Sequence, residues 1–153
     1  MLFGVGALAG TLLWLGLGWI PRRVAPAQAL RAFGAARGAF VRGDGRVDPL
    51  TVVGEVRGRP FTVTWQRPAG GGDVLLVGVD CAADVAEPLA PVAPAVAGGD
   101  APLTAAADAA LVTRWVRPPL ELFVAARIDA IVESMARLAE ELEATHPETP
   151  DPD

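Results

Sequence analysis

The first twenty residues restrict the fold of this chain more than any other segment. Residues 2–20, with the sequence LFGVGALAGTLLWLGLGWI, carry no charged side chain. As an α-helix they would extend about 28 Å, close to the thickness of the hydrocarbon layer of a bilayer. Pro21 follows as a helix breaker, and Arg22 and Arg23 then supply interfacial charges. Trp19 lies where aromatic residues usually meet the membrane interface. The segment therefore predicts a single transmembrane helix.

A cleaved secretory signal peptide is the alternative for the same segment. Residues 25–27 (APA) and 27–29 (AQA) have the small side chains of a cleavage site. A signal peptide, however, normally carries Lys or Arg before its apolar run, whereas here the two arginines follow the run. The sequence favours the anchor and leaves an exported periplasmic or secreted domain as the other interpretation.

The charges after this segment are unevenly distributed along the chain. Residues 21–67 hold nine Arg against three acidic residues, a net charge of +6, whereas residues 68–153 have a net charge of −11. A basic stretch next to a membrane anchor is attracted to anionic lipid headgroups. Arg residues beside an anchor also favour the cytoplasmic side, so we expect the soluble domain to be cytoplasmic. The residues expected at the membrane surface are Arg22, Arg23, Arg31 and Arg37.

Two glycines in the apolar segment have the spacing of a helix-packing motif. Gly6 and Gly10 form a GxxxG pair, which lets two transmembrane helices approach closely. They are candidates for a helix–helix contact in the membrane. Because the segment is rich in glycine, small residues that merely face lipid are the alternative.

About 130 residues follow the anchor, which suits one small domain. Residues 21–50 are expected to form a basic juxtamembrane helix, near 27–36, and a turn at residues 43–45. Residues 51–57, 60–66 and 74–79 predict three strands joined by short turns, and so an antiparallel meander. In the second strand Phe61, Val63 and Trp65 alternate with polar residues, which indicates a half-buried strand.

The segment after the third strand is harder to interpret. Residues 82–103 are rich in Ala and Pro, with prolines too closely spaced for a continuous helix, and are expected to form a surface linker. Residues 105–110 suit a helix, whereas residues 111–116 contain the β-branched and aromatic residues of a fourth strand. The strand is preferred for the second half.

A long amphipathic helix is predicted from the prolines at 118 and 119 to about residue 144. It would complete a soluble domain over residues 51–145, followed by an acidic tail at 146–153 that is expected to be disordered. The apolar stripe either covers one face of the sheet or forms an interface with another helix, because its spacing also fits a coiled-coil seam. Its residues are Val124, Ile128, Ile131, Met135, Leu138 and Leu142.

Residues that could carry chemistry are few. Cys81 and His146 are the single cysteine and histidine, and their expected positions, at a strand end and in the tail, do not predict a catalytic pair. Asp44 and Asp48 surround a glycine turn but lack the further ligands of an EF-hand. Because the chain has no Lys, a phosphate-binding loop with its lysine is excluded. No cofactor or metal is expected.

The sequence thus predicts an α+β protein: one N-terminal transmembrane helix, then a small antiparallel sheet of three or four strands packed by a long C-terminal amphipathic helix. The function expected by elimination is a non-enzymatic, membrane-anchored interaction or assembly module. Its partners would be the lipid bilayer and a protein or a second copy of the chain. Nucleic acid is not expected, because the domain is acidic and has no recognition motif. An enzyme or ligand-binding domain without a linear motif is the alternative.

Overall fold

The computed structural model describes residues 25–83, 103–107 and 109–145. The predicted transmembrane segment 2–20, most of the predicted linker and the predicted tail lie outside these residues. Within the described ranges, no helix is both long enough and apolar enough to cross a bilayer.

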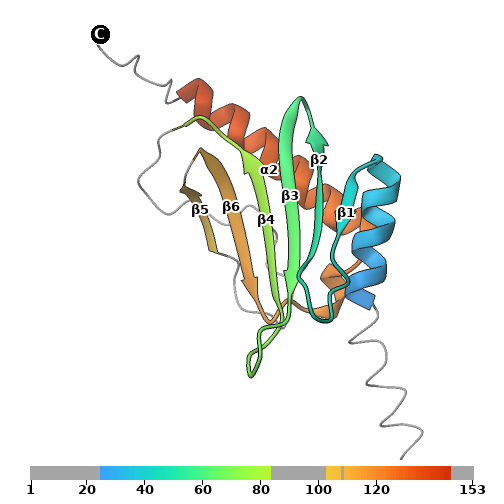
Figure 1. The fold of residues 1–153 in the computed structure, drawn as a ribbon. Coiled ribbons are helices and arrows are strands. Elements are labelled where there is room, and N and C mark those ends of the chain that lie inside the picture. Colours follow the sequence, from blue (N-terminus) through green and yellow to red (C-terminus); the bar gives the residue numbers. More distant parts are fainter. Residues whose placement is uncertain (1–24, 84–102, 108, 146–153) are drawn as a thin grey trace, which may run out of the picture.

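The centre of the structure is one antiparallel sheet (Figure 1). It has six strands in the order β1-β2-β3-β4-β6-β5, so that β6 pairs with β4 and β5 forms the far edge. Short turns connect β2 to β3 and β5 to β6, as expected for antiparallel neighbours. The strands are β1 (Phe40–Arg42), β2 (Leu50–Val56), β3 (Arg59–Gln66), β4 (Val74–Asp80), β5 (Leu103–Ala107) and β6 (Ala110–Val116).

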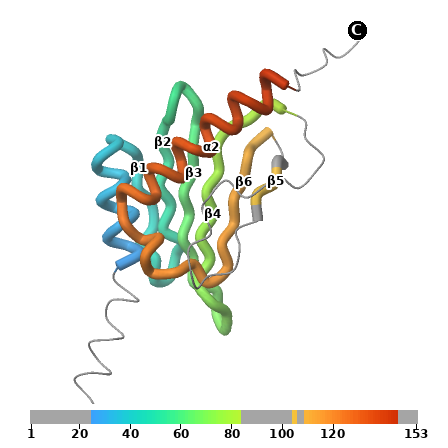
Figure 2. The backbone as a smooth tube through the Cα atoms, turned by 180° about the vertical axis from the view of Figure 1, so that it is seen from behind, coloured from blue at the N-terminus to red at the C-terminus, as the bar shows by residue number. Residues whose placement is uncertain are grey.

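Two helices pack on the same face of this sheet. Residues 25–37 are helical and lie at the β1 edge, and α2 (Ala125–Thr145) crosses behind the strands, as Figure 2 shows from the opposite side. The ring of Phe33 in the first helix lies 5.6 Å from that of Phe61 in β3. A short 3-10 turn, η1 (Leu120–Leu122), leads into α2.

The hydrophobic core lies between the helices and the sheet. In β3, Phe61, Val63 and Trp65 are buried and alternate with more exposed residues, so the predicted alternation is confirmed. Trp115 from β6 and Phe123 close one end of the core, where the rings of Phe123 and Trp65 meet edge to face at 6.3 Å. Alternation with period two places one half of each strand's side chains in this core.

The predicted α+β class is confirmed, but the predicted sheet of three or four strands is too small. The predicted strands correspond to β2, β3, β4 and β6. The additional strands are β1, which has only three residues, and β5, whose sequence is LTAAA. Neither has a strong strand pattern of its own, because alanine has a low strand propensity and three residues are too few to show alternation.

The helix considered for residues 105–110 is not formed by the described residues, since 105–107 end β5 and Ala110 begins β6. Ala109 turns the chain with a positive φ of 58°. The hairpin is held by its ladder and by a buried hydrogen bond between the hydroxyl groups of Thr104 and Thr113, 2.9 Å apart. Pairing with β6 therefore overrides the helical propensity of the alanines in β5.

The last helix begins later than predicted. Pro119 is extended, η1 follows, and Phe123 leaves helical geometry with φ −81° and ψ 57°. Leu120 and Val124, which fit the helical period, therefore precede α2 and stay partly exposed. Leu122 and Phe123 are buried in their place, because the 3-10 turn changes which side chains point toward the sheet.

Candidate interaction surface

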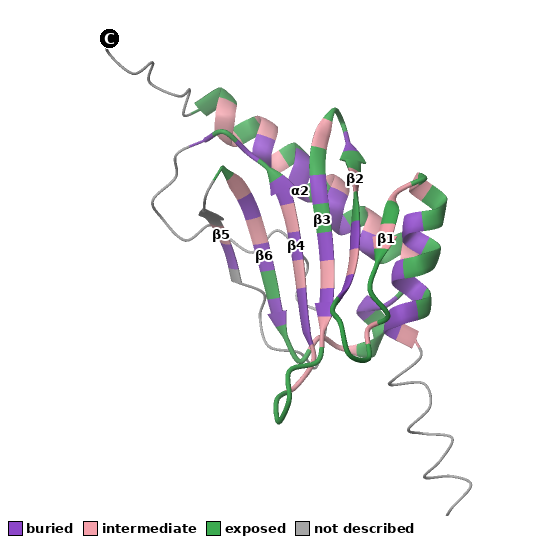
Figure 3. Ribbon diagram, viewed as in Figure 1, coloured by how far each residue is buried: buried purple, intermediate pink, exposed green. Residues whose placement is uncertain are grey.

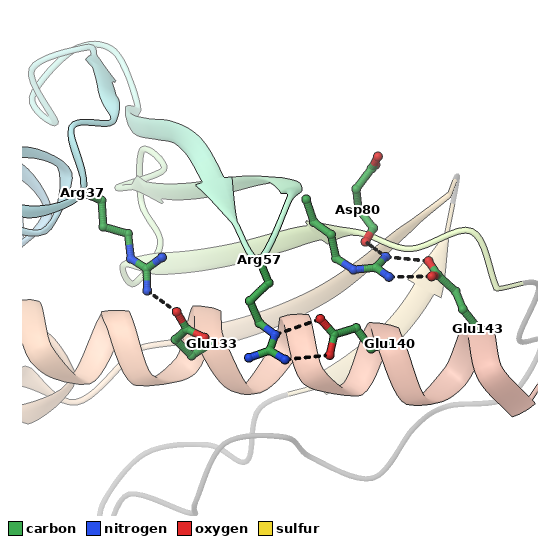
Figure 4. A network of polar contacts seen from close by, with 7 residues as sticks. Arg37, Arg57, Asp80, Glu133, Glu140 and Glu143 are labelled. Atoms are coloured by element: carbon green, nitrogen blue, oxygen red, sulfur yellow. Dashed lines mark hydrogen bonds and ion pairs between the residues drawn. The ribbon is translucent and has the colours of Figure 1, made fainter.

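Three arginines from the first half of the chain hold α2 in place (Figure 4): Arg57 and Arg59 attach it to the sheet, and Arg37 attaches it to the first helix. Arg57, in the β2–β3 turn, donates two hydrogen bonds to the carboxylate of Glu140, at 2.8 and 3.0 Å. Arg59 forms a similar two-point pair with Glu143, with both distances at 2.6 Å. Paired contacts of this kind fix the direction as well as the position of a helix.

Three described acids, Asp44, Glu140 and Glu143, have a lowered pKa, and the effect is largest for Glu143. The Arg59 guanidinium, and then the backbone N–H of Ala82 at 2.8 Å, stabilise its carboxylate and lower its pKa from 4.5 to about 2. The same Arg59 donates to the backbone oxygen of Asp80 at 3.2 Å. This cluster joins the end of β4 to α2, and the contacts within it explain the lowered pKa of Glu143.

Arg37, one of the residues expected at the membrane surface, lies against α2. Its guanidinium pairs with Asp129 and, at 2.7 Å, with Glu133, and these contacts raise the pKa of Arg37. Glu133 thus binds the first helix. Arg31 is exposed on that helix, while Arg22 and Arg23 lie outside the described residues.

The predicted apolar stripe of the last helix faces the sheet. Ile128, Ile131 and Met135 are buried in the core, and Leu138 and Leu142 pack against it in part. Val124 is about half exposed and lies before α2. In the folded chain most of the stripe is therefore covered by the sheet. Gly6 and Gly10, the candidates for contact in the membrane, lie outside the described residues.

The other face of the sheet carries no described helix (Figure 3). We call it the open face and define it by the side chains that alternate with those of the core. From the register of the six strands, these residues are Phe40, Arg42, Thr51, Val53, Glu55, Pro60, Thr62, Thr64, Gln66, Val74, Leu76, Gly78, Asp80, Ala105, Ala110, Val112, Arg114 and Val116.

Several apolar side chains on the open face are exposed to solvent. Phe40 is 70% exposed, Val53 42% and Val116 39%, and Leu76 and Val112 are half-buried. Single exposed apolar residues are common on protein surfaces, but contiguous groups mark sites of interaction. Phe40, Val53 and Val112 belong to one row that crosses the sheet perpendicular to the strands.

Charged side chains lie on either side of this row. Arg42 and Arg114 are two residues to one side of it, on β1 and β6, and Glu55 and Asp80 are two residues to the other side, on β2 and β4. All four residues are exposed, and none of these side chains forms an ion pair with another residue in the described ranges. The middle row of the open face, in which Thr62 and Gly78 lie between Val53 and Val112, therefore has a basic side and an acidic side.

The remaining candidate residues have local structural roles. The Asp44 carboxylate accepts hydrogen bonds from the backbone N–H groups of Arg46 and Val47, at 2.7 and 3.1 Å, and these bonds lower its pKa. Cys81 is buried, with its sulfur 4.0 Å from the backbone oxygen of Ala139. Among the described residues, no group of three or more His, Cys, Asp and Glu side chains could hold a metal ion.

One small hollow lies beside the turn that contains Asp44. It has a volume of about 200 Å³ and is formed by residues 45–49 and 66–68. That volume is below the range of about 300–1,000 Å³ usual for small-molecule sites. Arg46 and Asp48 contribute charge at its margin, and neither side chain is buried.

The open face had not been recognised from the sequence. The sequence feature that indicates the open face is the set of residues that alternate with the core residues along each strand. Val53, Leu76 and Val112 are in this set, at positions that are usually polar on a solvated sheet. That signal becomes readable only when both helices are known to lie on the same face. Compared with known proteins, the chain matches no family model, no curated protein and no solved structure.

Proposed function

We propose that this protein is a membrane-anchored interaction module that binds a protein through the open face of its sheet. The observation that carries the proposal is the exposed row around Val53, which lies opposite the face that both helices cover. A sheet that buries one face and exposes apolar residues on the other presents a preformed surface for a partner.

The anchor in this proposal is the apolar segment 2–20, followed by Arg22 and Arg23. Its support comes from the sequence: the length, the absence of charge and the interfacial residues that follow. The adjacent helix 25–37 lies at the β1 edge of the sheet (Figure 1). The domain is proposed to face the cytoplasm on account of its flanking arginines.

The test of the interaction is position-specific cross-linking in living cells. A photoreactive amino acid replaces Thr62, at the centre of the open face, or Ser134, an exposed residue of α2, as a matched control. We expect a discrete adduct after illumination with the probe at position 62 and none with the probe at position 134. If positions 53, 62 and 112 all yield only the uncross-linked chain, the open face is not a binding surface.

The anchor is tested separately by fractionation of the full-length chain carrying a C-terminal reporter. We expect the reporter to remain with membranes after alkaline extraction and to be protected from external protease. Release of a shortened chain, with a new N-terminus near residues 24–30, would instead indicate export after cleavage.

A further inference from the structure

We infer that the occupant of the open face is a second copy of this chain, packed face to face about a two-fold axis that runs across the strands. The inference rests on the proposed function and names its partner. In this arrangement the axis follows the row that contains Phe40, Val53, Thr62 and Val112, so that each of these residues meets the same residue of the second copy.

The charges on the two sides of the row complement each other in this arrangement. An axis across the strands brings the basic side of one copy over the acidic side of the other. Arg42 then faces Glu55 of the second copy, and Arg114 faces Asp80, because each pair lies at equal heights on opposite sides of the row. Each arginine is displaced by one strand, about 4.8 Å, which its long side chain can span.

The other two-fold arrangement of facing sheets is electrostatically unfavourable. An axis parallel to the strands would keep every residue at its own height, so that Glu55 would approach Asp80 of the second copy, and Arg42 would approach Arg114. Like charges that meet in an interface oppose association. The distribution of the four exposed charges therefore selects one of the two axes.

The position of the first helix agrees with the selected axis. An axis across the strands leaves the β1 edge of both copies on the same side, and the helix of residues 25–37 lies at that edge (Figure 1). Two chains that are anchored in the same membrane need their N-terminal helices on the same side. The face-to-face dimer meets this condition without a change in fold.

The size of the open face predicts a weak dimer that depends on the anchor. Six strands spaced by about 4.8 Å and about 20 Å long give a footprint of roughly 500 Å² for each copy. Stable interfaces bury about 800 Å² for each partner. Restriction to a membrane raises the effective concentration of the two copies and compensates for a small interface.

The experiment exchanges charges on the full-length chain in phosphatidylcholine vesicles. Association is measured as energy transfer between C-terminally labelled copies over a series of protein-to-lipid ratios. We expect Glu55→Arg and Arg42→Glu each to weaken association by about tenfold or more, and the double variant to recover most of it. Arg137→Glu, an exposed change on α2, is the control and is expected to leave association unchanged.

Two results would overturn the inference. One is a chain that stays monomeric at every ratio. The other is a dimer that is insensitive to both single exchanges, which would assign association to another surface, such as Gly6 and Gly10. If a photoreactive residue at position 62 still gives an adduct with a different protein, the proposed interaction function stands while the two-fold dimer is rejected.

Discussion

The two faces of the sheet are built from the same strands, yet they differ in what their side chains contact. On the covered face, Val52 is fully buried beneath the first helix, whereas its neighbour Val53, on the open face, is 42% exposed. The covered face contributes most of the burial that stabilises the domain. Residues on the open face are under weaker packing constraints, because fewer side chains cover them.

The sharpest test of this difference compares Val52→Asp with Val53→Asp, the same change at adjacent positions. The first places a carboxylate in the core and is expected to reduce the free energy of unfolding by about 4 kcal/mol or more. The second is expected to cost less than about 1 kcal/mol, because its carboxylate stays in water. Urea denaturation of the full chain in detergent, followed by tryptophan fluorescence, measures both. Equal losses would contradict the distinction between the faces.

A second test examines the loop that covers Trp65 at the margin of the core. Gly45 has a positive φ of 74°, and a β-carbon there would lie 2.4 Å from the Trp65 ring. We expect Gly45→Ala to cost about 2–3 kcal/mol, from backbone strain and steric overlap together. Gly70→Ala is the matched control, since Gly70 has a φ of 77° but no atom within 4 Å, and should cost about 1 kcal/mol. Thermal denaturation distinguishes the two variants.

A third test uses a pair of threonines on each face. The hydroxyl groups of Thr104 and Thr113 are buried and 2.9 Å apart, whereas those of Thr51 and Thr64 are partly buried and 3.2 Å apart. Thr113→Val leaves the Thr104 hydroxyl without its partner and is expected to cost about 1–2 kcal/mol.

The matching change on the open face, Thr64→Val, is expected to cost less than about 0.5 kcal/mol, because water can replace the lost hydroxyl. The double variant Thr104→Val and Thr113→Val should recover most of the loss, since no buried hydroxyl is then unpaired. Chemical denaturation measures this recovery. If the double variant is as unstable as Thr113→Val, the loss of stability comes from altered packing and not from the unpaired hydroxyl.

A smaller loss than for the changes in the core is expected from breaking the ion pair that fixes the end of α2 on the covered face. Arg59→Met is predicted to destabilise the chain by about 1 kcal/mol, as the pair is only partly buried. The folded-state pKa of Glu143, about 2, lies below its ordinary value of 4.5. Its contribution to stability is therefore present above about pH 4.5 and is lost as the pH falls toward 2.

The measurement is the difference in stability between the original chain and Glu143→Gln between pH 2 and pH 7. That difference in stability should decrease as the pH falls from about 4.5 toward 2. It should depend less on pH when Arg59→Met is also present. A difference that is constant with pH would mean that Arg59 does not stabilise the carboxylate.

Much of the sheet could be predicted because its central strands show their environment in their sequence. β3 alternates between apolar and polar residues, and β4 is apolar on both sides at Val74, Leu75 and Leu76. The pattern for β4 fits its central position, with pairing to β3 and β6. Local periodicity is sufficient where burial is regular.

The edges of the sheet and the start of α2 could not be predicted for a physical reason. β1 and β5 are defined by the strands beside them and not by their own residues. Val124 fits the helical period, but the 3-10 turn after Pro119 moves the first turn of α2 past it. The open face was missed because a list of strands does not say on which side the helices pack.

The uneven distribution of charge along the sequence suggests attraction to a membrane, but some of these charges form ion pairs within the fold. Arg37, Arg57 and Arg59 belong to the basic stretch, and their partners lie in the acidic half. Net charge by segment cannot distinguish internal pairing from attraction to a surface. Arg31 remains exposed and keeps the membrane interpretation open for the first helix.

These ion pairs join residues that are 83 to 96 positions apart in the chain, which has a consequence for biosynthesis. β4 ends at Asp80 and α2 at Thr145, so a ribosome that adds about 5–20 residues per second completes the helix roughly 3–13 s after the strand. Throughout that interval the nascent sheet exposes the apolar side that α2 later covers. Newly made chains are therefore expected to depend on a chaperone to avoid aggregation before the final helix arrives.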